Sequence, residues 1–480
     1  MHWWGSSEVE SRRKGLPAAL FQLFLLFVLF FVTCQPSAAI PAFARKYGMP
    51  CSACHLAWPM LSPFGQQFKD NGYQMGNERD APIFQQAAYW PITFRITPVW
   101  HRESTDKNQV DGAAGPGANE AKITTHGFDW SGLDFHTGGT LAKNFSFYVL
   151  PSSDNTGAFH FESVWARMDN LLGSSWLNVK MGKFELDNLL SEKRILTLTN
   201  VSGVYTNYHF QPFVAPGVVE NYTFGIGDNQ VGLEWMGHSK DDRTRVSAAL
   251  LSSNDGSPGL PTSRGYDAFF AASRAFEIGS LGLQRVGAFA YLGQAPTYFQ
   301  NNLTSTTVVG TDSVTGAPIT STTTAGYPGT GVGNKGFQRY GLLGQWYIKK
   351  FDITTIYFHS TDNAYLGTNT PAYSPLPAGA HSPTWNGGLF ESHYTFNPQL
   401  ILINRYELVR MSQQSFDTNP SNLGNADVLT FGFRYYPFIN ARAGFAYHGE
   451  YAIIWQKGAS PVTFTNQTTS SLLFGFDFDF

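Results

Sequence analysis

Hydrophobic positions near the C-terminus of the chain recur at every second residue. In residues 472–480 (LLFGFDFDF) phenylalanine alternates with glycine or aspartate. The same alternation occurs in residues 429–435 (LTFGFRY) and 92–96 (ITFRI). Because successive side chains of a β-strand point to opposite faces, each segment predicts a strand with one aromatic face and one polar face.

Turn signals separate such segments in a regular order. Short turns are predicted at residues 437–440, 396–399, 349–351, 277–280, 238–242, 170–173 and 136–140. Between them lie longer loops at 456–467, 412–424, 362–384, 295–335, 253–263, 151–158 and 102–121. Outer-membrane barrels alternate short periplasmic turns with longer external loops in this way. The count is 16 strands if residues 187–228 hold none, and 18 if they hold two.

Composition favours a membrane barrel over the alternative, a soluble β-sandwich with one wet face. Charged residues make up 14% of the chain, against about 25% in a typical soluble domain, and aromatic residues reach 15%. Beyond residue 40 no apolar run approaches the length of about 20 that a membrane helix needs. We therefore expect an all-β, transmembrane outer-membrane barrel of 16 or 18 antiparallel strands, wide enough to enclose an aqueous lumen.

The N-terminus has the features of an export signal. A positive cluster at residues 12–14 precedes an apolar run over 16–33, and small residues stand at 37–39. This order predicts a cleaved signal peptide over residues 1–39 and a bacterial outer-membrane location. A retained membrane helix and lipidation at Cys34 are alternatives, but the run is at the lower limit of spanning length and Thr33 suits a lipidation site poorly.

The segment CSACH at residues 51–55 is the strongest chemical signal in the chain. Two cysteines followed directly by histidine are what covalent attachment of a c-type haem requires. Cys51 and Cys54 would form the two thioethers, and His55 would be the proximal iron ligand. Export would bring these residues to the compartment where haem is attached. The predicted cofactor is one covalent haem c.

The cysteines have two other possible uses. A thioredoxin-like redox site would need a βαβ context, and none surrounds the motif. A structural zinc site would need four ligands, whereas the only other cysteine is Cys34 and no second His or Cys pair lies nearby. Haem attachment explains the motif better than either.

The second axial ligand of the iron is less clearly marked. No histidine occurs between His55 and His101, so a methionine is the natural candidate, and a His/Met pair raises the reduction potential. Met49 lies too close before the motif, and Met60 is expected on the same helix as His55. Met75 follows enough chain to cross to the far side and is the preferred distal ligand. Met60, a barrel residue or an open site remain alternatives.

The mature chain is expected to have two parts. Residues 40–86 form a small helical haem module, and residues 87–480 form the barrel. A module of about 47 residues is close to the size that needs a covalent staple to fold, and the haem would supply one. Its place is expected within or against the barrel lumen, or else in the periplasm.

Charge and motifs narrow the functional classes. The net charge is only −3, so nothing indicates nucleic acid as a partner. No paired carboxylates, Ser/His/Asp arrangement or phosphate loop supports hydrolysis or group transfer.

The N-terminal segments PAFARKYG (41–48), CSACH (51–55), PFGQQFK (63–69) and NGY (71–73) resemble the start of the fused monohaem cytochrome-porins. The best-known branch of that family is the iron-oxidising outer-membrane cytochrome. The resemblance implies that Cys51 and Cys54 carry the haem and that His55 binds its iron. It also implies a donor outside the cell, Fe(II), a soluble periplasmic cytochrome as acceptor, surrounding outer-membrane lipid, and an Fe(II):cytochrome c oxidoreductase activity.

Two other functions stay open at this point. One is a solute-conducting porin whose haem-bearing plug gates or senses. The other is a conduit that exports electrons to reduce acceptors outside the cell.

Overall fold

The computed structural model describes residues 42–57, 60–76, 80, 82, 92–110, 119–153, 156–186, 229–252, 266–296, 301–311, 318–327, 334–362, 384–411, 425–438, 444–457 and 465–479. The predicted signal peptide, residues 187–228 and the terminal Phe480 lie outside the described residues.

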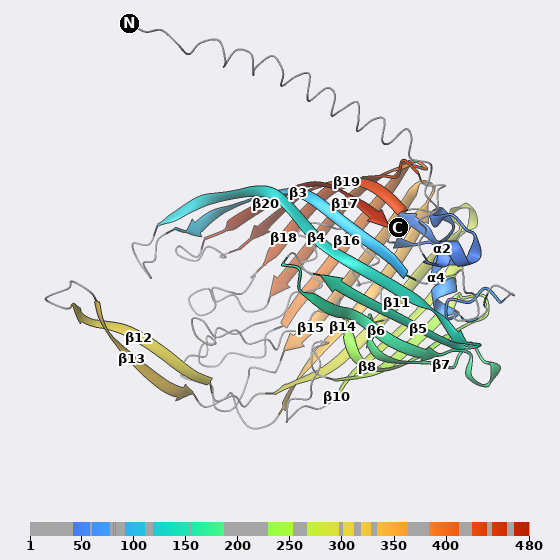
Figure 1. Cartoon of the computed structure of the whole chain (residues 1–480), viewed down its shortest axis with the longest axis horizontal. Coiled ribbons are helices and arrows are strands. Elements are labelled where there is room, and N and C mark those ends of the chain that lie inside the picture. The colour runs from blue at the N-terminus through green and yellow to red at the C-terminus, as the bar shows by residue number, and fades with distance from the viewer. Residues whose placement is uncertain are drawn as a thin grey trace, which may run out of the picture. The chain divides into compact units, whose positions relative to one another are not determined.

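Sixteen antiparallel strands close into a barrel (Figure 1). Their bounds are β3 Ile92–Gln109, β4 Glu120–Ala142, β5 Phe145–Ser153, β6 Phe159–Met168, β7 Asn178–Phe184, β8 Gln230–His238, β9 Thr244–Ser252, β10 Tyr266–Glu277, β11 Leu283–Pro296, β14 Asn334–Ile348, β15 Phe351–Asp362, β16 Thr384–Asn397, β17 Leu400–Met411, β18 Ala426–Tyr435, β19 Gly444–Gln456 and β20 Gln467–Asp479. The barrel closes where β20 pairs with β3, as in Leu473 opposite His101. Since β7 pairs directly with β8, the count is 16 and not 18.

Short and long connections alternate around the barrel, as the sequence predicts, but two predicted connections are misplaced. The loop expected at residues 102–121 is shorter, because β3 continues to Gln109 and β4 begins at Glu120. The short turn expected at residues 136–140 is wrong: these residues belong to β4, and the turn comes at residues 143–144. Gly138 and Gly139 had suggested a turn. Gly138 instead allows a close approach, because an added Cβ would lie 2.9 Å from Tyr148 Cδ2 and 3.7 Å from Phe43 Cζ.

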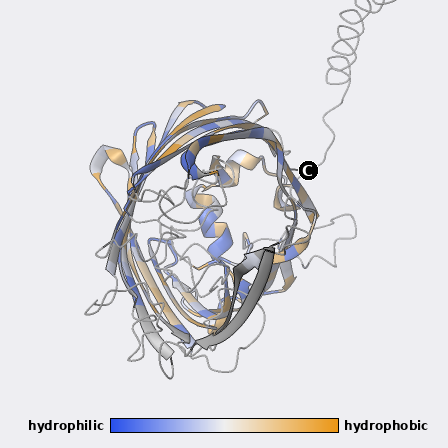
Figure 2. Ribbon diagram, turned by 90° about the vertical axis from the view of Figure 1, so that its left-hand side faces the viewer, coloured by the Kyte–Doolittle hydropathy of each residue, from blue (hydrophilic) through white to orange (hydrophobic). Residues whose placement is uncertain are grey.

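Exposed apolar side chains cover the outside of the barrel, and buried polar side chains face its inside. On β20, Phe474 is 46% exposed and Asp477 is fully buried; on β18, Phe431 is 48% exposed and Arg434 is 1% exposed. Figure 2 shows hydrophilic and hydrophobic residues interspersed along the wall strands. This confirms the predicted alternation, which is the reverse of a soluble protein and suits a lipid surround.

The long loop predicted at residues 295–335 contains structure of its own. Strands β12 (Asn301–Thr311) and β13 (Pro318–Tyr327) form a separate two-stranded sheet that does not join the barrel. Both strands are rich in threonine, a β-branched residue that favours extended structure.

The N-terminal segment, residues 42–57 and 60–76, is called the plug from here on. It contains α2 (Ala42–Tyr47), α3 (Cys51–Cys54), the short strand pair β1 (His55–Ala57) and β2 (Met60–Leu61), and α4 (Pro63–Asp70). Ser62 caps α4, since its hydroxyl accepts a hydrogen bond from the Gly65 N–H at 3.0 Å, and Pro63 occupies the first helical position. The expected helices are present, but Met60 lies on a strand and not on a helix with His55.

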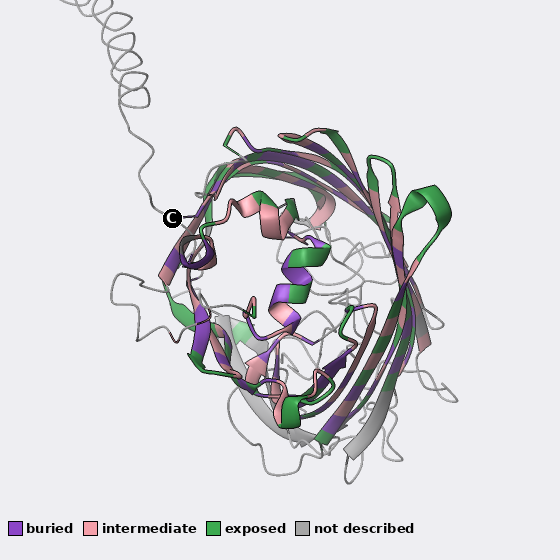
Figure 3. Ribbon diagram, turned by 90° about the vertical axis from the view of Figure 1, so that its right-hand side faces the viewer, coloured by how far each residue is buried: buried purple, intermediate pink, exposed green. Residues whose placement is uncertain are grey.

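The plug lies inside the barrel at the end with the short turns (Figure 3). The Ala42 N–H donates to the hydroxyl of Thr93 at 2.8 Å, near the start of β3. At the other end of the plug, Arg245 contacts the Asp70 carboxylate at 2.9 Å, close to the turn between β8 and β9. Ile40–Phe480 form one compact unit. Within the described ranges, no helix is long and apolar enough to span a membrane.

Part of the lumen is an apolar core. Aromatic residues of the plug pack with side chains of β6, β7, β9 to β11 and β14 to β17, and with Leu186 just after β7. The cluster consists of Tyr47, Phe68, Tyr73, Trp165, Phe184, Leu186, Ala249, Leu251, Phe269, Phe289, Tyr291, Leu343, Ile356, Phe358, Leu389 and Val409. The expected aqueous lumen is therefore filled on this side. The arrangement ties plug and wall together by burial of apolar area.

Candidate haem pocket between the plug and the barrel wall

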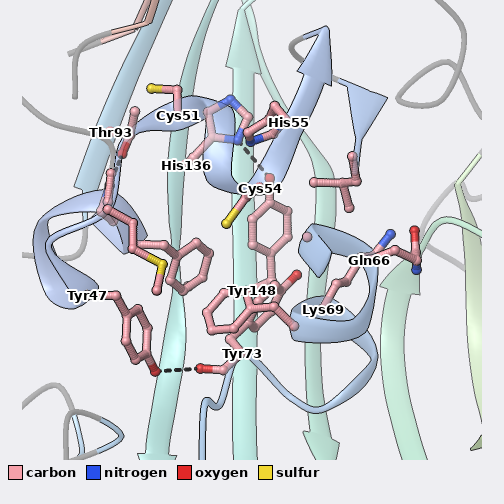
Figure 4. A pocket seen from close by; sticks show the side chains of 18 of the residues that line it. Tyr47, Cys51, Cys54, His55, Gln66, Lys69, Tyr73, Thr93, His136 and Tyr148 are labelled. Carbon is pink, nitrogen blue, oxygen red and sulfur yellow. Dashed lines mark hydrogen bonds between the residues drawn. The ribbon is translucent and has the colours of Figure 1, made fainter. Parts of the chain in front are cut away.

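A cavity of about 280 Å³ lies between the plug and the barrel wall. The side chains of Cys51, Cys54 and His55 all line it (Figure 4). The structure thus brings the three residues of the predicted haem motif to one cavity. Their chemical roles stay a prediction.

Local structure explains why the two thiols share a cavity. Pro50 begins α3, a single turn in which Cys51 and Cys54 are three residues apart and so lie on one side of the helix. The Ser62 N–H donates to the Cys54 carbonyl at 2.8 Å, and the Ser62 hydroxyl donates to the Ala53 carbonyl at 3.2 Å. The cap of α4 therefore also holds the end of α3.

Gly65 is needed where α4 meets α3. A Cβ added at this position would lie 2.0 Å from the Cys54 carbonyl oxygen. We expect Gly65→Ala to push the helices apart, to cost about 1–3 kcal/mol as overpacking does, and to lower the yield of covalent haem several-fold. Gly127→Ala is the matched control, because nothing lies within 4 Å of its added Cβ. The measurement is haem per protein after denaturation, and an unchanged yield would contradict this account of the contact.

The two cysteines are free thiols in a partly buried setting. Burial, with the nearby Asp479 carboxylate, raises the pKa of Cys51 to about 11, and burial also raises the pKa of Cys54. Thiol exchange and zinc binding both use thiolates, which a raised pKa disfavours. In the part of the chain that the structure describes, no group of three or more His, Cys, Asp or Glu side chains could hold a metal ion.

The cavity walls are aromatic on both sides. The rings of Phe43 and Tyr73 are stacked with centroids 4.7 Å apart, and Tyr73 stacks at 6.0 Å on Trp165 of the barrel. Tyr148 lies 5.9 Å from Trp165. Flat aromatic surfaces of this kind suit a large planar apolar group such as a porphyrin.

Cationic side chains enter the same cavity from the wall. Arg95, Arg167 and Lys180 line it. Each has a carboxylate partner on the wall, as in the 2.5 Å contact of Arg167 Nε with Asp169. A haem carries two propionates on an apolar body, so apolar walls with cations at the edge fit it. These residues are the ones that would hold the propionates.

The two methionines left open as distal ligands, Met75 and Met60, lie in different places. Met75 lines the cavity and packs against the apolar core cluster. Met60 instead packs against Ile401, Ile403 and Tyr436 of the barrel. The structure therefore retains Met75 as a candidate, and its role stays a prediction.

Sequence reasoning missed one histidine of the cavity. His136 of β4 lines it, and its Nδ1 lies 2.7 Å from the hydroxyl of Tyr148 on β5. Asp134, His136, Gly138 and Thr140 stand at every second position and so share one face of a strand. This spacing could have predicted a strand through His136. The adjacent glycines favoured a turn instead.

Comparisons with known proteins find similarity in three dimensions only. No family model matches the chain, and no curated protein matches it in sequence. Among solved structures, an anion-selective porin from Comamonas acidovorans is 10% identical, with a TM-score of 0.49 over 81% of this chain and 99% of that one. The outer membrane channel DcaP of Acinetobacter baumannii is 9% identical, with a TM-score of 0.43 over 81% and 98%. A loop-deletion mutant of OmpT from Vibrio cholerae is 12% identical, with a TM-score of 0.43 over 82% and 100%.

Proposed function

We propose that this chain is an electron-transfer protein of the bacterial outer membrane that holds one covalent haem c. The observation that carries the proposal is that Cys51, Cys54 and His55 line one aromatic cavity edged by cations. Bound haem would supply a one-electron Fe(III)/Fe(II) couple. The two cysteines would anchor it, His55 would bind its iron, and the aromatic walls would exclude water.

The apolar outer surface of the barrel supports a place in a lipid bilayer, with the short turns in the periplasm. The cavity is then close to the periplasmic side, within reach of a soluble periplasmic cytochrome. A donor outside the cell is far from it. The 12 residues of β17 alone extend roughly 30 Å along the barrel axis at usual strand rise and tilt. The donor must therefore enter the lumen, which suits a small ion such as Fe(II).

Stopped-flow spectroscopy tests the donor. Oxidised, haem-loaded protein mixed with Fe(II) is expected to show the absorbance change of haem reduction. Zn(II) has the same charge and no accessible redox step, so it serves as the control and should produce no change. Absence of reduction by Fe(II) would reject iron as the donor. A midpoint potential well below the Fe(III)/Fe(II) couple at working pH would also reject it and would favour export of electrons.

A solute-conducting channel is the second candidate function. A closed 16-stranded barrel with polar inward-facing residues favours it, because barrels of this width can conduct. The plug and the apolar core cluster occupy part of that lumen. We expect the purified protein to show little or no ion conductance in a planar bilayer. Sustained conductance at the level of an open porin would support the channel and contradict a plugged conduit.

A further inference from the structure

Iron in a haem has two axial positions, on opposite faces of the porphyrin. In the proposed function His55 occupies one of them from the plug side of the cavity. The other face must then meet the opposite wall, which the barrel supplies through β4, β5 and β6. We propose that His136 of the barrel wall is the second axial ligand, in place of Met75. This inference rests on the proposed function and adds a ligand to it.

His136 lies where the plug is tied to the wall. In the barrel, His136 is directly opposite Thr93, and the Thr93 hydroxyl accepts the hydrogen bond from the first residue of α2. His136 and His55 both line the cavity, and Figure 4 labels them in its upper part together with Cys51. The register of β3 and β4 thus brings the imidazole to the haem motif.

Tyr148 holds the ring of His136 in a suitable orientation. The hydroxyl lies 2.7 Å from Nδ1, and the two ring centroids are 6.2 Å apart. Histidine ligands in metal sites usually donate the proton of one ring nitrogen to a fixed partner, which leaves the other nitrogen for the metal. With the proton on Nδ1 and donated to Tyr148, Nε2 is the nitrogen that would bind iron. Tyr148 is itself fixed by Trp165 and by close contact with Gly138.

Met75 lines the same cavity, but the backbone around it is held by Asp80. The N–H of Met75 and that of Gly76 donate to the Asp80 carboxylate at 2.7 and 2.6 Å. The same carboxylate accepts a hydrogen bond from the Tyr47 hydroxyl at 2.8 Å. Figure 4 places Tyr47 and Tyr73 away from His55. Met75 belongs to the plug, as His55 does, whereas His136 belongs to the barrel wall. A ligand that approaches from the wall is therefore His136 and not Met75.

A histidine in place of methionine as the second axial ligand is expected to lower the midpoint potential of the haem. A methionine ligand raises the potential of a c-type haem, so two histidines give a lower one. Replacing His136 by methionine should therefore raise the midpoint potential. Iron bound by one residue of the plug and one of the wall would also join the two parts.

The test compares the full-length, haem-loaded wild type with the variants H136A, H136M and M75L. We expect low-spin ferric spectra for wild type and M75L, without the weak far-red band of a methionine–ferric iron bond. H136A should become high-spin and return to low-spin when imidazole is added. H136M should gain the far-red band and a higher midpoint potential in a redox titration.

Several results would overturn the inference. They are a far-red methionine band in the wild type, an H136A spectrum that stays low-spin without imidazole, or loss of the low-spin spectrum in M75L. If H136A does not fold, the far-red band in the spectra of the wild type and H136M still shows whether methionine or histidine binds the iron. Covalent haem content and reduction by Fe(II) are measured on the same samples. Wild type without covalent haem would reject the proposed function as well, whereas a haem-loaded wild type with methionine ligation would reject His136 alone.

Discussion

Replacing both Cys51 and Cys54 by serine is expected to abolish covalent haem. Serine hydroxyls form no thioether, so haem would be lost when the protein is denatured. Haem staining after denaturing electrophoresis should fall to background, and reduction by Fe(II) should disappear with it. The plug would also lose the covalent link to haem that helps it to fold, and at fewer than 50 residues it has only a small hydrophobic core of its own.

Ser52→Ala is the matched control for the double variant. Ser52 lies between the two cysteines and is exposed, so its loss should leave haem content unchanged. The barrel should survive in both variants, because its strands pair with one another and not with α3. Haem that stays attached after denaturation in the double variant would overturn the assignment of the motif.

Replacing Arg405 by methionine is expected to destabilise the barrel strongly. Arg405 is fully buried and contacts the carboxylates of Glu391 and Glu407, the latter at 3.1 Å. Arg405 and Glu391 are directly opposite each other on β17 and β16. Without the guanidinium, two buried carboxylates lose their shared counter-charge. Breaking a buried ion pair in this way costs about 3–5 kcal/mol.

Unfolding by urea in lipid vesicles, followed by tryptophan fluorescence, measures the loss. Arg102→Met is the control, since Arg102 is exposed on β3 and its replacement should change the free energy of unfolding by less than about 0.5 kcal/mol. The double variant E391Q/R405M should recover part of the stability, because it removes one of the stranded charges. Equal unfolding midpoints for wild type and Arg405→Met would show that these carboxylates do not depend on Arg405.

The sequence predicts the barrel well because its two signals are local. Alternation in residues 472–480 and 429–435 follows from the period of a strand, and the turn lengths follow from which end of the barrel a connection closes. The limits of individual strands are harder to predict, as the extension of β3 to Gln109 shows. Strand ends depend on pairing with a neighbour, and that pairing is set by register across the sheet.

Only part of the candidate haem pocket could be predicted from the sequence. Cys51, Cys54 and His55 are recognisable because the whole motif lies within five adjacent residues. His136 is not, since its place in the pocket depends on the register of β4 against β3 and on a plug that comes much earlier in the chain. Gly138 gave a misleading signal for a related reason. From the sequence alone, a strand glycine that makes room for a neighbouring side chain cannot be distinguished from a glycine that forms a turn.

The position of the cavity between plug and wall sets the order in which the protein must be made. Cys51 and Cys54 face the barrel wall, and the plug is held there by hydrogen bonds, ion pairs and an apolar core. An enzyme that attaches haem could not reach the two thiols once the strands have closed around them. Haem ligation is therefore expected while the chain is still unfolded in the periplasm, before insertion into the membrane. If the proposed haem is correct, a cell that lacks haem ligation would deliver to its outer membrane a barrel with two free thiols in the cavity.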